Sequence, residues 1–99
     1  MSNIKSRIHE NSRLVKLAKE ASKSVQTGLD QLSRELSKGN FNPGIGTKHL
    51  FGSVYEARGR DGARVYFQTD SDGVIEILAK SNKANQRQVI NILRKMYEQ

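Results

Sequence analysis

Residues 53–80 read SVYEARGRDGARVYFQTDSDGVIEILAK, and this stretch decides the fold. Polar and apolar side chains alternate through Ser53–Arg58 and Ala63–Gln68, and a strand over Val74–Lys80 would put Ile75, Ile77 and Ala79 on one face, patterns typical of half-buried strands. The intervening segments Gly59–Gly62 and Asp70–Gly73 are rich in Gly and Asp, and they predict tight turns. Two tight turns in succession predict an antiparallel meander of three strands.

Helical periodicity flanks the predicted strands on both sides. Before them, the spacing of apolar residues predicts a helix that begins near Ser22 or Ser24 and ends at Gly39-Asn40; its stripe is Val25, Leu29, Leu32 and Leu36. After them, a second stripe predicts a helix over residues 85–97, formed by Val89, Ile90, Leu93, Met96 and Tyr97. Pro43 and two glycines predict a loop over Phe41–Thr47.

These elements predict an α+β fold with two regions. Residues 1–21 are more polar and are expected to form a helical arm or extension, and residues 22–99 the domain itself. The domain would have an N-terminal helix or helices, a three-to-four-stranded antiparallel sheet, and a C-terminal helix packed on one sheet face. One face must be covered to bury the apolar strand residues, so we expect the other face to be open and polar.

Composition limits the chemistry that the chain can perform. There is no cysteine, and the two histidines, His9 and His49, lie far apart in the sequence without clustered carboxylates, so no metal site and no cofactor are expected. No apolar run is long enough to span a bilayer, and no membrane association is expected. The net charge of +7 favours an anionic partner such as nucleic acid or an acidic protein.

The predicted open face carries most of the polar side chains that could act together. If the strands pair as a meander, one surface gathers Glu56, Arg58, Arg64, Tyr66 and Lys80. A solvated sheet face decorated with cross-strand charge pairs would have the same residues. A site that grips a phosphodiester backbone is the functional alternative.

Such a site could cleave RNA without a metal ion. The ribose hydroxyl would attack phosphorus, with Glu56 as base, His49 as acid, and Arg58, Arg64 and Lys80 stabilising the developing negative charge. Tyr66 could orient the substrate or stack on a base. The Ser81–Gln86 junction at a helix start is a candidate anion site. The expected RNA contacts are Lys48, Arg60, Lys83, Gln86 and Arg87.

Three blocks of the sequence carry a resemblance to a known group of proteins: Asn42–Thr47, Glu56–Phe67 and Ile75–Gln86. They resemble the C-terminal toxin modules of bacterial polymorphic and contact-dependent toxins. The order of elements is similar to that of the RelE/ParE-like toxins and the wider group of small ribonuclease toxins related to barnase and the tRNA-cutting colicins. The resemblance covers roughly residues 24–99.

The resemblance implies a small endoribonuclease toxin that cuts mRNA or tRNA and blocks translation. It also implies neutralisation by a cognate antitoxin or immunity protein, and action in the bacterial cytoplasm, either where the toxin is made or after delivery from another cell. The positions that it carries over are basic residues and one tyrosine: Arg58, Arg64, Tyr66, Lys80 and Lys83.

Two other functions are compatible with the same residues. One is a non-catalytic accessory factor of a phage or mobile element that binds nucleic acid or protein. The other is a gyrase-directed inhibitor, which would cause DNA breaks rather than arrested translation. Catalysis predicts that one substitution, such as Arg64→Ala or Glu56→Ala, abolishes toxicity, whereas binding alone predicts graded losses and steep salt dependence. The sequence leaves the oligomeric state open.

Overall fold

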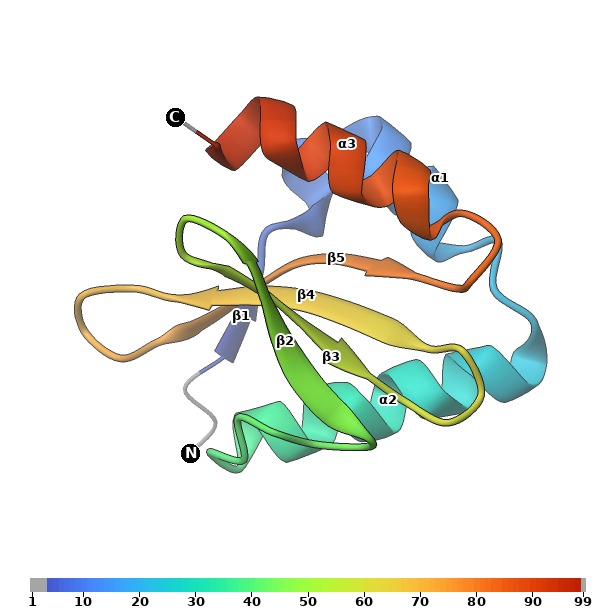
Figure 1. Ribbon diagram of the computed structural model, residues 1–99, viewed down its shortest axis with the longest axis horizontal. Helices are drawn as coiled ribbons and strands as arrows, with labels where there is room; N and C mark the ends of the chain where they lie inside the picture. The colour runs from blue at the N-terminus through green and yellow to red at the C-terminus, as the bar shows by residue number, and fades with distance from the viewer. Residues whose placement is uncertain (1–3, 99) are drawn as a thin grey trace.

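The structure is a computed structural model that describes residues 4–98, and it has three layers (Figure 1). A five-stranded sheet in the order β1-β5-β4-β3-β2 forms the middle layer. Helix α2 covers one face, and α1 and α3 cover the other. The elements in chain order are β1 (Ile4–Ser6), the 3-10 helix η1 (Ile8–Glu10), α1 (Ser12–Ala18), α2 (Lys23–Ser37), β2 (Gly46–Phe51), β3 (Val54–Arg58), β4 (Arg64–Thr69), β5 (Ile75–Ser81) and α3 (Gln86–Tyr97).

The predicted α+β class and the antiparallel meander are confirmed, as β3, β4 and β5 pair in sequence order. The sheet is mixed, however, because β1 pairs in parallel with β5, with Ile4 opposite Ile75. The expectation of a purely antiparallel sheet was therefore wrong. The predicted loop also ends early, because β2 starts at Gly46 and pairs antiparallel with β3.

Helix α2 covers the sheet face that we call the α2 face. Ser22 caps its start, since the Ser22 hydroxyl accepts a hydrogen bond from the Val25 amide at 3.4 Å. Its predicted apolar stripe is buried against sheet residues Ala57, Val65, Phe67, Ile75 and Ile77. The N-terminal helix of the predicted domain is thus confirmed.

The opposite face is covered as well, so the predicted open polar face was wrong. Helices α1 and α3 place Leu14, Leu17, Val89 and Leu93 in a second core, which we call the α1/α3 face, against sheet residues Val54, Tyr66, Leu78 and Ala79. Two short amphipathic helices cannot leave their apolar sides in water, and this sheet face offers enough apolar area to bury them. Polar side chains on this face therefore meet helices rather than solvent.

The described part of residues 1–21 is integrated into the domain and is not a separate arm. It supplies β1 at the sheet edge and α1 above the sheet. Asn11 caps α1 by accepting hydrogen bonds from the amides of Arg13 and Leu14, at 2.9 and 3.0 Å. Leu14 and Leu17 are then buried one turn apart. Residues 1–3 of the predicted arm lie outside the described residues.

A buried carboxylate ties this N-terminal segment to the sheet. Glu76 accepts hydrogen bonds from Gln68 Nε2 at 2.7 Å and Arg7 Nη1 at 3.2 Å, and Lys5 Nζ lies 3.3 Å away. The Gln68 amide, together with Arg7 and Lys5, lowers the pKa of Glu76 below its ordinary value, although burial opposes the shift. A lowered pKa means that the charged form stabilises the folded state.

Glu76→Gln should therefore lower the free energy of unfolding by about 2 kcal/mol at neutral pH, because it removes a charged acceptor from three donors. The stabilisation is present above the ordinary carboxyl pKa and is lost as the pH falls through the lowered value, so the variant should also lose stability less steeply in acid. Urea unfolding at neutral and acidic pH measures both effects. Glu98→Gln removes a carboxylate from an exposed ion pair; it is the matched control and should change the free energy of unfolding little.

Candidate nucleic-acid interface

The strand register places four of the six predicted catalytic residues together. Glu56 lies opposite Tyr66, and Arg58 lies opposite Arg64, on adjacent strands β3 and β4. Residues at alternate positions of a strand point to the same face, so these four side chains share the α1/α3 face. The register agrees with the predicted grouping of these four, but the face they share is covered by α1 and α3 and is not the open face that was predicted.

Lys80 does not join them, because β5 carries an irregularity. Phe67 lies opposite Ile77 while its neighbour Tyr66 lies opposite Ala79, so Leu78 is an extra residue in β5. The bulge brings Leu78 and Ala79 onto the same core, and it leaves Lys80 opposite Val65, on the α2 face. The predicted place of Lys80 beside the arginines was wrong.

His49 also lies on the α2 face, opposite Tyr55. Its ring nitrogen Nε2 is 2.8 Å from the Gly52 carbonyl oxygen, and its ring centroid is 5.1 Å from that of Tyr55. The sheet therefore separates His49 from Glu56 and the arginines. The predicted pairing of Glu56 as base with His49 as acid at one phosphate was wrong.

Glu56 and Tyr66 are buried beneath α3, with 2% and 0% of their surfaces exposed. The Gln86 side-chain amide donates to Glu56 Oε2 at 2.8 Å, and the Tyr66 hydroxyl is 2.9 Å from Ser81 Oγ. Burial raises the pKa of Tyr66 far above its ordinary value, with the charge of Glu56 adding to the shift. Tyr66 is thus a neutral core residue, and it has no exposed ring on which a base could stack.

Arg58 and Arg64 form the most unusual feature of the molecule, and we call them the arginine pair. They are direct cross-strand neighbours; Arg64 is only 8% exposed and Arg58 is half-buried. The Nε atoms of both are buried and have no hydrogen-bond partner. No ion pair between described residues includes either of them.

Two adjacent cations, one buried and one half-buried, destabilise a fold when no carboxylate pairs with them directly; Glu56 shares their face but makes no ion pair with either. Like charges directly opposite each other on a sheet repel, and a desolvated charge needs a partner. A guanidinium presents a planar fork of donors that matches a carboxylate or a phosphate, so a bound anion would relieve both costs. The arginine pair therefore has the composition and burial of an anion-binding site.

Other polar groups lie around the arginine pair. Ser81 lies opposite Arg64, and Lys48, which is exposed, lies opposite Glu56 on the edge strand β2. The stem of Lys83 packs against the turn at Gly62, since a methyl group built at Gly62 would lie 3.3 Å from Lys83 Cγ. Two lysines thus lie on elements that adjoin the strands of the arginine pair.

The junction between β5 and α3 offers fewer donors than expected. The amides of Asn82 and Asn85 each donate to the other residue's Oδ1, at 3.0 and 2.9 Å, and Asn85 Nδ2 donates to the Leu17 carbonyl oxygen. These groups fix α3 onto α1 and are not available to an anion. Gln86 and Arg87 follow at the start of α3, where with Ile90 and Asn91 they line a hollow of about 590 Å³.

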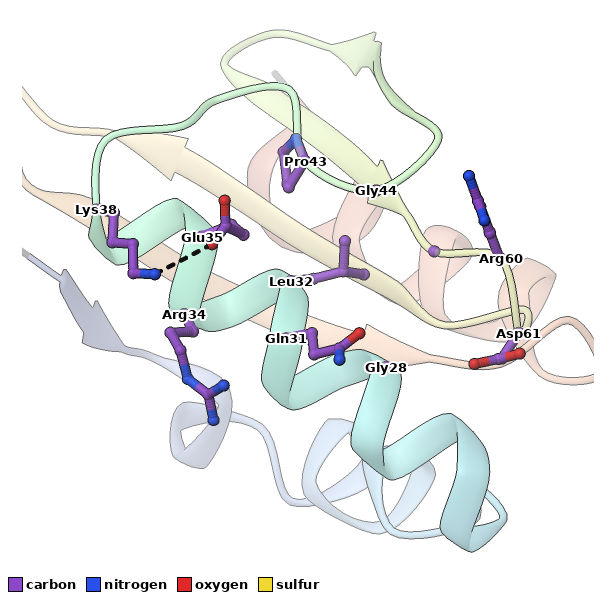
Figure 2. A pocket seen from close by; sticks show the side chains of 11 residues that line it. Gly28, Gln31, Leu32, Arg34, Glu35, Lys38, Pro43, Gly44, Arg60 and Asp61 are labelled. Atoms are coloured by element: carbon purple, nitrogen blue, oxygen red, sulfur yellow. Dashed lines mark hydrogen bonds and ion pairs between the residues drawn. The ribbon is translucent and has the colours of Figure 1, made fainter.

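Arg60 lies apart from these residues, beside a groove between α2 and two loops (Figure 2). The groove has a volume of about 590 Å³, and Figure 2 shows Asp61 pointing toward Gly28 while Arg60 points away from the helix. Three basic and two acidic side chains line the groove, and Lys38 pairs with Glu35 at 3.4 Å. The groove therefore has only a small excess of positive charge.

Sequence reasoning missed Ser81 as a partner of Tyr66 and Gln86 as the cover of Glu56. Ser81 was placed in the candidate anion site and Gln86 also among the expected RNA contacts, and neither residue type signals a buried polar contact by itself. It also missed the α2-face residues around Tyr55. An aromatic residue on a strand usually belongs to the core, so its exposure could not be foreseen.

No group of three or more His, Cys, Asp or Glu residues suited to a metal ion is found within residues 4–98. Within the same range, no helix has the length and apolar character to cross a membrane. No protein-family model matches the chain, and no curated protein is similar to it in sequence.

Proposed function

We propose that the protein is a small endoribonuclease of the bacterial toxin type that binds an RNA phosphodiester at the arginine pair and cleaves it without a metal ion. The observation that carries the proposal is the pair itself, two adjacent arginines, one buried and one half-buried, whose Nε atoms lack a hydrogen-bond partner and which make no ion pair with a described residue. The net charge of +7 would draw RNA to this surface.

The reaction would be an internal transesterification. The ribose 2′-oxygen forms a bond to phosphorus while the bond from phosphorus to the 5′-oxygen breaks, which leaves a 2′,3′-cyclic phosphate and a free 5′-hydroxyl. Arg58 and Arg64 would stabilise the extra negative charge on the phosphoryl oxygens. Glu56 would take the 2′-proton once Gln86 turns aside, and Lys48, on the facing strand, would protonate the leaving oxygen.

Purified protein incubated with single-stranded RNA in the presence of a chelator tests this proposal. We expect cleavage products that end in a cyclic phosphate, and no cleavage of a matched RNA whose 2′-hydroxyls are replaced by hydrogen. Induced expression in a bacterium, followed by mapping of RNA ends, should show cut mRNA or tRNA and arrested growth. RNA that stays intact in both experiments would contradict cleavage.

The burial of Glu56 and Tyr66 favours a second candidate function, which is RNA binding without cleavage. In that case the arginine pair would hold a phosphate and no nearby base would be accessible. RNA would then bind with an affinity that falls steeply with salt, and basic substitutions across the surface would cause graded losses. A neutralising antitoxin or immunity protein is expected only for the toxin.

A further inference from the structure

A second site lies on the α2 face, away from the arginine pair. It is a hollow of about 560 Å³ that is bounded by strands β2, β3 and β4 and by the loop that follows α2. Its lining is aromatic and polar: Phe41, Asn42, Thr47, Tyr55, Phe67 and Thr69. No lysine, arginine or carboxylate lines it.

Aromatic rings are unusually exposed here. Phe41 is 49% and Tyr55 41% exposed, and with Ile45 they are the exposed large apolar residues of the described chain. The Tyr55 ring stacks on buried Phe67 with centroids 5.8 Å apart, and His49 leans against it from β2. Tyr55 is therefore held in place on a rigid sheet, while its exposed area remains open to a ligand.

The hollow also contains polar groups without partners. The Thr47 hydroxyl is buried and makes no hydrogen bond. Asn42 Oδ1 accepts from the Thr47 amide at 2.7 Å, which fixes the Asn42 side chain and leaves its Nδ2 group as a donor. A buried hydroxyl that lacks a partner costs free energy unless a ligand supplies one.

We propose that this hollow binds a nucleobase of the same RNA strand. A planar base between Phe41 and Tyr55 would gain the stacking that proteins use to bind single-stranded RNA. Its edge would pair with Asn42 Nδ2, and with Thr47 Oγ1 once that buried hydroxyl rotates toward the hollow. A base is flat, with apolar faces and a polar edge. The lining offers aromatic rings to the faces and polar side chains to the edge. The inference rests on the proposed function, since it takes RNA as the partner.

The two sites are placed to act on one strand. Tyr55 and Arg58 are three residues apart on β3, which is ~10 Å along the strand, and they point to opposite faces. Only the edge strand β2 lies outside β3, and it carries Thr47 on the α2 face and Lys48 on the other. An RNA strand that passes over β2 from one sheet face to the other would place a base in the hollow and phosphates at Lys48 and the arginine pair.

Binding of a short single-stranded 2′-O-methyl RNA tests the inference, because this RNA cannot undergo transesterification. The second probe is the same strand with abasic sugars in place of nucleosides. Tyr55→Val should weaken binding of the intact probe by ~10-fold and leave the abasic probe unchanged, because only the stacking is lost. Thr47→Val should weaken only the intact probe, by ~3-fold, without lowering the unfolding midpoint.

Ile45→Ala is the matched control, since it removes an exposed apolar side chain beside the hollow, and it should bind both probes normally. Arg64→Gln should weaken both probes. If Tyr55→Val weakens binding of both probes equally, the hollow contacts RNA without recognising a base. If Tyr55→Val leaves RNA affinity unchanged but abolishes self-association in sedimentation, the hollow is a protein interface. Either result would overturn the base site. Base-dependent binding with no cleavage of natural RNA would leave the base site standing and remove the nuclease.

Discussion

Arg64→Gln should reduce RNA cleavage by about 100-fold or more and leave the protein at least as stable as the wild type. Both effects have the same origin. Arg64 is 8% exposed, its Nε has no partner, and Arg58 lies directly opposite, so repulsion between the two charges disfavours the folded state and a bound anion would relieve it. Glutamine removes that charge along with the phosphate contact.

Cleavage rates on single-stranded RNA and urea unfolding of the same preparations measure the two effects. Arg13→Gln, which removes an equal charge from the exposed side of α1, is the matched control and should leave cleavage within a few-fold of wild type. A loss of stability in Arg64→Gln with cleavage retained would show that Arg64 only supports the fold. Equal loss of cleavage in both variants would reduce its role to general electrostatic attraction.

Gly44→Ala should lower the free energy of unfolding by about 3 kcal/mol or more. Gly44 has a φ of +63°, and a methyl group added there would collide with the backbone oxygen of Arg58 and lie 3.0 Å from Leu32 Cδ2. Neither a backbone oxygen nor a packed core side chain can move away cheaply. The loop would have to shift, and with it the hydrogen bond of 2.9 Å from the Ile45 amide to Arg58.

Gly39→Ala separates the collision from the backbone strain. Gly39 has a φ of +92°, and a methyl group added there would have nothing within 4 Å. The control variant should therefore lose only about 1 kcal/mol, the cost of left-handed backbone for a residue with a side chain. Similar losses in the two variants in urea unfolding would show that the contact with Arg58 and Leu32 is not tight in solution.

The meander and its flanking helices could be predicted because their signals are local. The alternation of side chains along each strand predicted that Glu56, Arg58, Arg64 and Tyr66 share a face, and the strand register agrees. Helices α2 and α3 have apolar stripes long enough to identify, and Ser22 stands where a cap is needed. These elements are specified by residues within a few positions of one another.

The bulge in β5 could not be predicted, and it decides where Lys80 points. Ile77, Leu78 and Ala79 are consecutive apolar residues, so the sequence does not show which of them is the extra one, and a regular period of two was assumed through Lys80. A shift of one residue turns every later side chain to the other face. The pattern therefore placed Lys80 with the arginines, although it lies across the sheet from them.

That helices cover the α1/α3 face could not be predicted either, for a different reason. Helix α1 has one turn of buried contact, from Leu14 to Leu17, which is too short for a clear period. The residue before that helix, Asn11, is polar because it caps the helix. Strand β1 is three residues long, and its partner is far away in sequence. Burial of Glu56 and Tyr66 follows from these non-local contacts, which no local pattern encodes.

The pairing of β1 with β5 has a consequence for the newly made chain. Ile4 leaves the ribosome long before its partner Ile75, which lies far along the chain. Closing so long a loop is slow compared with forming the hairpins of the meander. We therefore expect the hairpins to form first and β1 to dock last, so that the nascent polypeptide completes its sheet only after β5 has emerged.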